Sequence, residues 1–244
     1  EDSESKRRNF LGKIAESNAM TESSDLLAKA KDLLRTKSLR EVAEAIYPLL
    51  QDQETTEYES SLALFKFCVD NAPDALTLKL LKVYPSSYCP VFRFRWIYML
   101  FETITYLRNC NFRFSPTYLP RIKPYLIACV KMEGSKDSEI KILGRIVSFV
   151  AYNVANGGGG EWSELSDCIL KFANDEPRRA CLVVLELPLA YGRFINRFAN
   201  AVLDRAKTVL LAPQLVGAKD WGMVLQTAIK IGVLLSDSRN AVET

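Results

Sequence analysis

The sequence predicts an all-α protein, an α-α superhelix of about twelve helices. Three observations support this prediction. Apolar residues recur at the three- and four-residue spacing of one helix face, as in Tyr58, Leu62, Phe65 and Val69. The alternation of apolar and polar residues that is typical of strands is nearly absent, and short polar turns separate the helical stretches. The 244 residues, 48% apolar and 25% charged, are enough to form one ample core.

Capping residues and turns divide the first third of the chain into four helices. A Ser, Thr or Asp side chain accepts a hydrogen bond from a free amide in the first turn of a helix. The Ser-Ser-Asp cluster 23–25 and Ser38 therefore predict the first two starts, and Thr55 or Thr56 predicts the third. A turn at 71–74 leads into the fourth helix. The predicted helices lie at about residues 23–37, 38–51, 55–71 and 73–84.

The fifth helix lies where two patterns overlap. Phe92 to Trp96 alternate with arginines as in a strand, but Phe92 and Trp96 also continue into a helical stripe with Met99 and Tyr106. Pro90 fits the first turn of a helix because it has no N–H to leave unpaired. We therefore predict one helix over 90–109. By the same signals, further helices are predicted at 115–132, 137–156, 162–173, 177–187, 192–211 and 219–235.

The spacing of the predicted helices indicates how they are organised. One helical pair occurs about every 40 residues, close to the 40–47 residues of HEAT and armadillo repeats, and short helices bury wide apolar faces by stacking. An irregular globular bundle remains the alternative. Four glycines follow residue 156, but no Gly-Lys-Ser/Thr follows them, so a hinge is expected there rather than a phosphate loop. The predicted domains are N-terminal repeats 1–156, a Gly-rich loop 157–161 and C-terminal repeats 162–244, or one continuous solenoid.

The chain contains no histidine. Imidazole titrates near neutral pH and is the commonest metal ligand, so Ser-His-Asp triads, Cys-His pairs and His-bearing zinc sites are excluded from this segment. Carboxylate pairs such as Asp175-Glu176 lie at turns or helix starts, where capping explains them. We expect no enzyme activity, no cofactor, no metal and no small-molecule substrate.

The cysteines and the length of the apolar runs indicate in which cellular compartment the protein is expected. The six cysteines, at 68, 89, 110, 129, 168 and 181, form no CxxC pair, which favours buried, reduced thiols in an intracellular protein, cytoplasmic or nuclear or both. No apolar run approaches the roughly 20 residues of a membrane span, so no membrane partner is expected. The chain begins with Glu1 and shows no signal peptide, so we interpret it as a fragment or a processed product.

Positive charge and aromatic rings gather in the middle of the chain. Residues 82–125 hold seven basic and one acidic side chain, whereas the whole chain has a net charge of +3. They also hold 12 of the 25 aromatic residues. Such a mixture is typical of surfaces that bind acidic peptides or single-stranded nucleic acid, and packing of the rings in a core also explains it. The candidate partner-binding residues are Arg93, Arg95, Arg108, Arg113, Arg121 and Lys123.

These observations favour a non-enzymatic protein-protein interaction scaffold of HEAT/armadillo type. Its partner is expected to be another protein, bound through a concave face of the repeats or through the basic segment 88–125, where an acidic segment would fit. The alternative is an RNA-binding helical-repeat protein that uses the same segment. The mild net charge of +3 favours a protein partner, because nucleic-acid-binding domains usually have a stronger basic surface. A third class is a purely structural, self-associating repeat.

Four motifs follow one another in the second half of the chain. They are GEWSEL at Gly160–Leu165, ANDEP at Ala173–Pro177, LELP at Leu185–Pro188 and the pair Phe194-Ile195. In this order they resemble a plant family of armadillo-like helical proteins, the domain of unknown function number 577. The resemblance covers about residues 157–212. It implies a plant, intracellular, non-enzymatic scaffold, and it implies no catalytic or ligand-binding residue.

Overall fold

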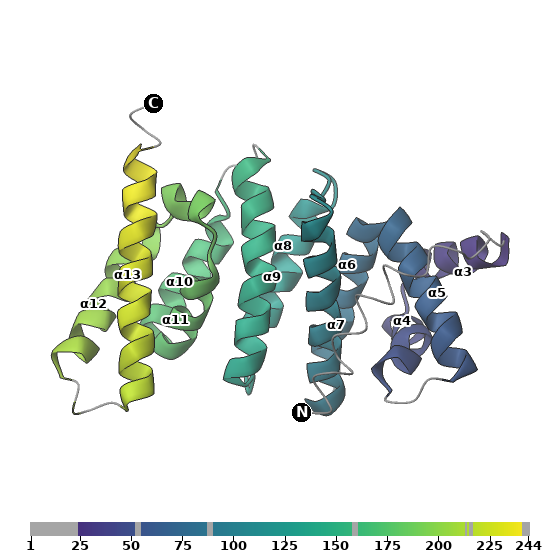
Figure 1. Ribbon diagram of the computed structural model, residues 1–244, viewed down its shortest axis with the longest axis horizontal. Coiled ribbons are helices and arrows are strands. Elements are labelled where there is room, and N and C mark those ends of the chain that lie inside the picture. Colours follow the sequence, from purple (N-terminus) through teal and green to yellow (C-terminus); the bar gives the residue numbers. More distant parts are fainter. Residues whose placement is uncertain are drawn as a thin grey trace. The chain divides into compact units, whose positions relative to one another are not determined.

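A computed structural model of the chain describes residues 24–51, 55–86, 90–157, 161–212, 214 and 217–240 (Figure 1). These residues form helices, and no strand occurs among them, so the all-α prediction is confirmed. The chain divides into two compact units, Glu1–Tyr125 and Leu126–Thr244. Each unit is described by itself below.

Unit 1 contains helices that pack both on their neighbours and on the next helix but one. Its helices are α3 (Ser24–Arg35), α4 (Leu39–Ile46), η1 (Tyr47–Leu50), α5 (Thr56–Asn71), α6 (Pro73–Val83), η2 (Tyr84–Ser86), α7 (Pro90–Asn109) and the start of α8 (Leu119–Lys131). Helix α3 packs on α5, α4 on α6, and α6 on both α5 and α7. Fully buried side chains from four of these helices, including Val42, Phe65, Leu80 and Leu100, form its core.

The predicted helix starts of unit 1 are confirmed by their caps. The hydroxyl of Ser38 accepts a hydrogen bond from the amide of Glu41 at 3.2 Å, and that of Thr55 accepts one from the amide of Tyr58 at 3.2 Å. Helix α7 begins at Pro90 and ends at Asn109, as predicted. The strand-like alternation at its start therefore lies on a helix, with Trp96 buried against α6.

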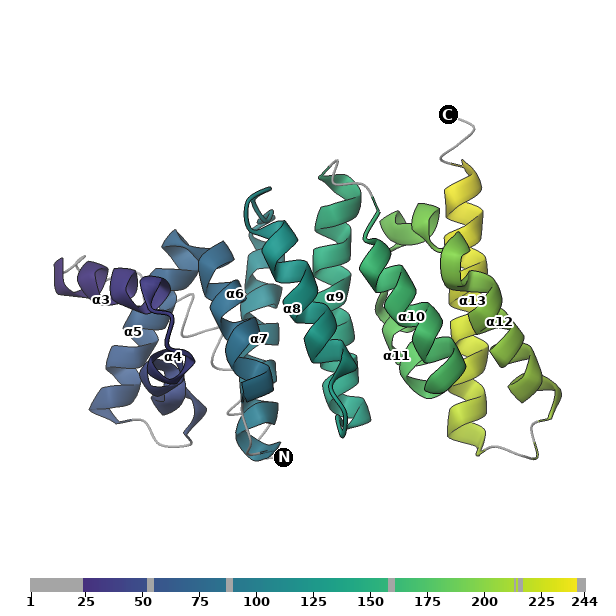
Figure 2. The ribbon, with the colours of Figure 1, turned by 180° about the vertical axis from the view of Figure 1, so that it is seen from behind.

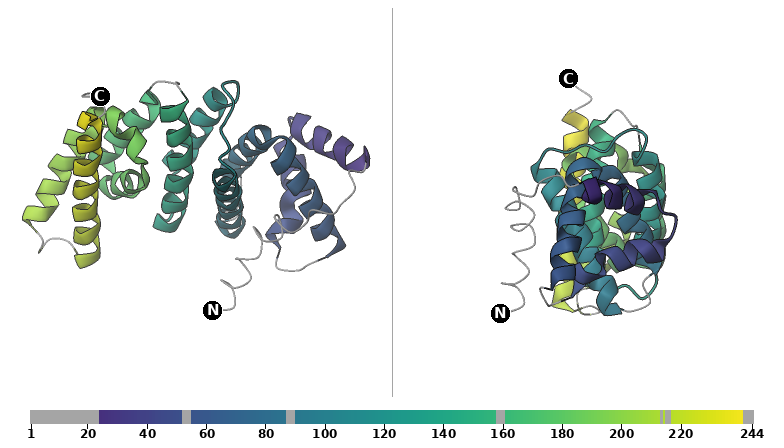
Figure 3. Two further views of the ribbon diagram at one scale, coloured as in Figure 1. Left: turned by 45° about the horizontal axis from the view of Figure 1, so that its top comes forward. Right: turned by 90° about the vertical axis from the view of Figure 1, so that its right-hand side faces the viewer.

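Unit 2 arranges its helices in two layers. They are α9 (Asp137–Asn156), α10 (Ser163–Asp175), α11 (Pro177–Glu186), η3 (Leu189–Phe194), α12 (Asn196–Leu211) and α13 (Ala218–Asn240). Helix α11 packs between α9 and α13 in one layer, while α10 packs on α12 in the other (Figures 1 and 2). Helices α12 and α13 lie side by side in the left view of Figure 3. Each helix thus covers an apolar face of the helix two positions away.

Two contacts join η3 to other segments of unit 2. Trp162 and Tyr191 are fully buried, and the Tyr191 hydroxyl donates a hydrogen bond to the carbonyl oxygen of Trp162 at 3.0 Å. At Gly192 the backbone of η3 lies directly against α13, since an added Cβ atom would stand 2.5 Å from the carbonyl oxygen of Leu234. Glycine is therefore required here by close approach of two backbones.

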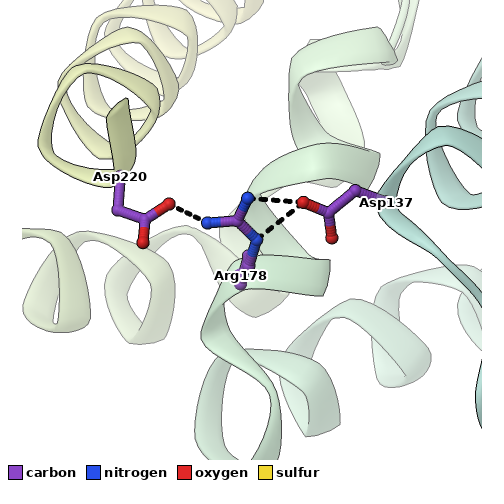
Figure 4. Close-up of polar contacts among 3 residues, drawn as sticks. All are labelled: Asp137, Arg178 and Asp220. Atoms are coloured by element: carbon purple, nitrogen blue, oxygen red, sulfur yellow. Dashed lines mark hydrogen bonds and ion pairs between the residues drawn. The ribbon is translucent and has the colours of Figure 1, made fainter. Parts of the chain in front are cut away.

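A three-helix ion network ties the layer of α9, α11 and α13 together (Figure 4). The Arg178 Nε atom on α11 donates to Asp137 Oδ2 at the start of α9 over 2.8 Å. The same guanidinium also forms an ion pair with Asp220 in the first turn of α13. The hydrogen bond from Arg178 holds the pKa of Asp137 below its usual value.

Some helix boundaries differ from the sequence predictions. Helix α8 begins at Leu119 rather than 115, because Ser115 to Tyr118 form a turn whose Ser115 amide is bonded to Asp74. The stretch predicted as the start of a helix at 192 is the 3-10 helix η3, and α12 begins at Asn196. The Gly-rich loop predicted at 157–161 lies within the sequence range of unit 2. Helix α9 before that loop packs on α11 after it, and Gly158 to Gly160 lie outside the described residues.

Candidate functional site

Helix α7 points its two candidate arginines in different directions. Residues two positions apart on a helix point about 200° apart, so Arg93 and Arg95 face different directions. The Arg95 guanidinium donates to the carbonyl oxygen of Leu50 at the end of η1. Both arginines are half-buried. Arg95 therefore links two helices of unit 1, which gives this side chain a structural role.

The two other candidate arginines that do not lie on α8, Arg108 and Arg113, are well separated along the chain from Arg93 and Arg95. Arg108 is exposed in the last turn of α7, where a cation is stabilised by the helix dipole. At 1.5 Å per residue, Arg93 and Arg108 are about 22 Å apart along the helix axis. Arg113 is exposed in the connection that leads to α8. The six predicted residues thus do not form one compact site, and their role in binding stays a prediction.

Three of the aromatic residues of the segment 82–125, Tyr84, Trp96 and Phe114, are buried in the core of unit 1. Trp96 and Tyr84 are buried, and the Trp96 Nε1 atom donates to the carbonyl oxygen of Leu80 at 2.9 Å. Phe114 is buried and packs edge-on against Phe112 at 5.5 Å between ring centroids. Packing therefore accounts for these rings, as the alternative interpretation of the segment expected.

One cluster does bring cations and aromatic rings together at a surface, and we call it the basic-aromatic surface. Its residues are Lys79 and Lys82 on α6, Tyr118 just before α8, and Arg121 and Tyr125 on α8. The Lys82 Nζ atom lies 4.9 Å from the centroid of the Tyr125 ring. The Arg121 Cζ atom lies 5.3 Å from the centroid of the Tyr118 ring. Tyr125 is 39% exposed, so the surface is open to solvent.

The geometry at the start of α8 explains why Tyr118, Arg121 and Tyr125 share a face. Tyr118, Arg121 and Tyr125 are spaced by three and then four residues, which places them along one side of a helix. Their span of seven residues corresponds to about 10 Å along the helix axis. Cation-π contacts hold the two cations over the rings. The surface is therefore an elongated strip in which the positive charges are positioned in advance.

The three cations of the basic-aromatic surface repel one another. The pKa of Lys79 is lowered mainly by burial, and further by the charges of Lys82 and Arg121. The Lys79 ammonium group donates to the carbonyl oxygen of Thr36 at the end of α3. Among the described residues, no ion pair joins any of the three cations to a carboxylate. An anion that binds there would relieve the repulsion.

Of this cluster, only Arg121 was predicted from the sequence as a candidate binding residue. Lys82 and the two tyrosines lie inside the segment 82–125, but Lys79 lies outside it. The two lysines are three residues apart on α6, which is a signal for a shared face. That α6 presents this face to the start of α8 depends on tertiary packing, for which the sequence holds no local signal.

Burial also affects the chemistry of the described thiols. Burial raises the pKa of the Cys68 and Cys129 thiols to about 12 and that of Cys168 to about 11, so these thiols stay protonated at neutral pH. Within the described ranges, no group of three or more Cys, Asp and Glu side chains is arranged to hold a metal ion. None of the described helices combines the length and the apolar character needed to cross a bilayer.

Four of the five cysteines that the structure describes are buried, as expected, and one is exposed. Cys68, Cys129, Cys168 and Cys181 are buried thiols outside any disulfide, and Cys110 is an exposed thiol outside any disulfide. Cys89 lies outside the described residues. Cys181 borders an apolar cavity of about 20 Å³ between α10, α11, α12 and α13, which has room for about one water molecule.

Fold and site together define an all-α protein of packed helices with a basic-aromatic surface in unit 1. The model of one family, described as a repeat of unknown function (DUF577), matches residues 119–244. The chain belongs to this family, as the motifs within 157–212 predicted. Comparisons with curated proteins and with solved structures found no match.

Proposed function

We propose that this chain is a non-enzymatic, intracellular protein-interaction module of the HEAT/armadillo kind, and that it binds an acidic segment of a partner protein at the basic-aromatic surface. The observation behind this proposal is that Lys79 is repelled by the charges of Lys82 and Arg121. None of the three forms an ion pair with a carboxylate among the described residues. An acidic peptide would supply the missing anions. Electrostatic complementarity of this kind gives an interface its specificity and speeds association.

The arrangement of the rings supports a peptide over RNA. Proteins that bind single strands without base pairing stack bases on the faces of aromatic side chains. Here Lys82 covers a face of Tyr125 and Arg121 covers a face of Tyr118, so part of the stacking area is already occupied. The net charge of +3 is also mild for a nucleic-acid-binding domain.

Two further observations support the repeat architecture in this proposal. The family is described as a repeat, and in unit 2 α9 packs on α11, α10 on α12 and α11 on α13. HEAT and armadillo proteins bury helix pairs in this manner by stacking successive repeats. Free buried thiols such as Cys68 and Cys129 suit a reducing intracellular compartment.

The direct test compares peptide binding by two variants of equal charge. Lys82→Glu with Arg121→Glu reverses two cations of the surface, while Lys171→Glu with Lys207→Glu reverses two exposed cations of unit 2. We expect a glutamate-rich peptide, followed by fluorescence anisotropy, to bind the first variant at least tenfold more weakly than the parent and to bind the control almost unchanged. Equal loss in both variants would mean that net charge alone drives binding and would contradict the proposal.

Two other classes of function predict different results. Single-stranded RNA that binds more tightly than the peptide, with a steep dependence on salt, would favour the RNA-binding alternative. A mass that rises with concentration in sedimentation, together with no binding of peptide or RNA, would favour a self-associating structural repeat.

A further inference from the structure

The charge and layout of the basic-aromatic surface indicate more than a preference for acidic residues. We propose that the surface recognises a phosphorylated side chain in the partner peptide, with the phosphate held among Lys79, Lys82 and Arg121. This inference rests on the proposed function and specifies the group that anchors the partner.

The first argument is the balance of charge. The charges of Lys82 and Arg121 both act on Lys79, and none of the three cations pairs with a carboxylate among the described residues. A carboxylate brings a single negative charge and two acceptor oxygens. A phosphorylated serine or threonine brings about 1.5 to 2 negative charges at pH 7 and three strong acceptor oxygens. The phosphate therefore matches three cationic donors better than one carboxylate does.

The second argument is that the cations are held in place before a ligand arrives. Arg121 rests over the Tyr118 ring and Lys82 over the Tyr125 ring, while the Lys79 ammonium is fixed by the carbonyl oxygen of Thr36. Fixing rotamer-rich side chains normally costs free energy on binding, and here part of this ordering is already complete. An ammonium has three N–H donors, so Lys79 keeps two for a ligand after it bonds to Thr36.

The third argument is the type of cation. A guanidinium presents planar pairs of N–H donors that match phosphate oxygens, whereas an ammonium acts as a compact point charge. One arginine with two lysines thus supplies both a directional contact and the charge that neutralises a dianion. Burial lowers the pKa of Lys79 most, and the repulsion by Lys82 and Arg121 that lowers it further is relieved more fully by two negative charges than by one.

The experiment uses three nine-residue peptides that differ only at the central position. That position is phosphoserine, glutamate or serine, and the flanking residues are glutamate and alanine. We expect the phosphoserine peptide to bind the whole chain at least tenfold more tightly than the glutamate peptide in fluorescence anisotropy. Inorganic phosphate at millimolar concentration should compete with it.

Substitutions that replace a cation by the uncharged residue glutamine identify the binding residues. Lys82→Gln with Arg121→Gln should reduce the affinity for the phosphoserine peptide to that for the glutamate peptide, while Lys171→Gln with Lys207→Gln should leave it unchanged. Circular dichroism melting curves of all the variants should coincide, because the substituted side chains are exposed or half-buried. If Lys82→Gln lowers the melting temperature, the single variant Arg121→Gln gives the same comparison.

The outcomes separate this inference from the proposed function. Equal affinities for the phosphoserine and glutamate peptides, both lost in the Gln variant, would overturn phosphate recognition and leave acidic-peptide binding in place. No binding of either peptide would contradict the proposed function itself. Tighter binding of single-stranded RNA than of the phosphopeptide, with the same sensitivity to Arg121→Gln, would overturn the inference in favour of a nucleic-acid phosphate.

Discussion

Gly192 shows how one atom can decide the packing of two helices. A Cβ atom at this position would stand 2.5 Å from the carbonyl oxygen of Leu234, and neither backbone can move without disturbing η3 or α13. We predict that Gly192→Ala lowers the free energy of unfolding of the chain by about 1–3 kcal/mol, the usual cost of forcing extra atoms into a packed site.

Urea denaturation followed by circular dichroism measures this effect. The matched control is Gly232→Ala on α13, where an added Cβ atom meets nothing within 4 Å. Alanine is favoured over glycine inside a helix by about 0.5–1 kcal/mol, so the control should be slightly more stable than the parent. A Gly192→Ala protein as stable as the parent would show that the close approach is absent in solution.

The buried thiols and phenol determine how the chain responds to alkali. The pKa of Cys68 and of Cys129 is raised to about 12 by burial, from 9.0, and that of Tyr191 is raised to about 12, from 10.0. The folded state therefore keeps protons that the unfolded chain releases. Stability from these groups is complete below about pH 9 and is lost as the pH rises toward 12.

We predict that the free energy of unfolding, measured in urea under reducing conditions, falls steadily between about pH 9 and 12. Cys129→Ala should make this fall less steep, since one thiol no longer contributes. An unchanged slope in this variant would show that the Cys129 thiol is not buried in the folded chain.

Which residues form the candidate site was only partly predictable from the sequence. Arg121 and the aromatic character of its segment could be recognised from local composition, as could the opposed directions of Arg93 and Arg95. The bond from Arg95 to Leu50 and the position of Lys79 beside Arg121 both join residues more than 40 positions apart. Contacts of that range follow from tertiary packing, which helical periodicity does not specify.

At the scale of whole helices, the predicted helix starts were correct where a single capping residue or proline marks them. Ser38, Thr55, Pro90 and Pro177 each begin or cap the predicted helix. The start of α8 was misplaced because Ser115, a good capping residue, instead forms a turn that Asp74 on α6 holds in place. The 3-10 helix η3 was missed because its close contact with α13 has no periodic signal.

The ion network of Arg178 should stabilise the joint between α9, α11 and α13. Arg178→Met removes both ion pairs while it keeps much of the apolar stem. We predict a loss of about 0.5–1 kcal/mol in the free energy of unfolding, because side chains that are 41–46% exposed are screened by water. Lys207→Met, at an exposed lysine of α12, is the control and should change stability little.

The dependence of this effect on pH provides a second check. Asp137 has a lowered pKa in the folded chain, so its contribution is present above the ordinary Asp pKa near 3.8 and is lost as the pH falls through the lowered value. The difference between the parent and Arg178→Met should therefore be larger at pH 7 than at pH 3. Equal differences at the two pH values would contradict an ionic role for Arg178.

At the scale of the molecule, the all-α fold and the membership of the family followed from sequence alone. The layered packing of α9, α11 and α13 agrees with the expected rhythm of helix pairs. The absence of histidine limits the switching chemistry of the chain to partner binding or to modification of other side chains. Binding at the basic-aromatic surface is the function that these features support together.

The most direct test of this account is nuclear magnetic resonance of the isotope-labelled chain as the phosphoserine peptide is added. We predict that the resonances of Lys79, Lys82, Tyr118, Arg121 and Tyr125 shift together and saturate with one dissociation constant. Shifts that cluster on other helices, or no shifts at millimolar peptide, would contradict the central claim that this surface binds an anionic partner segment.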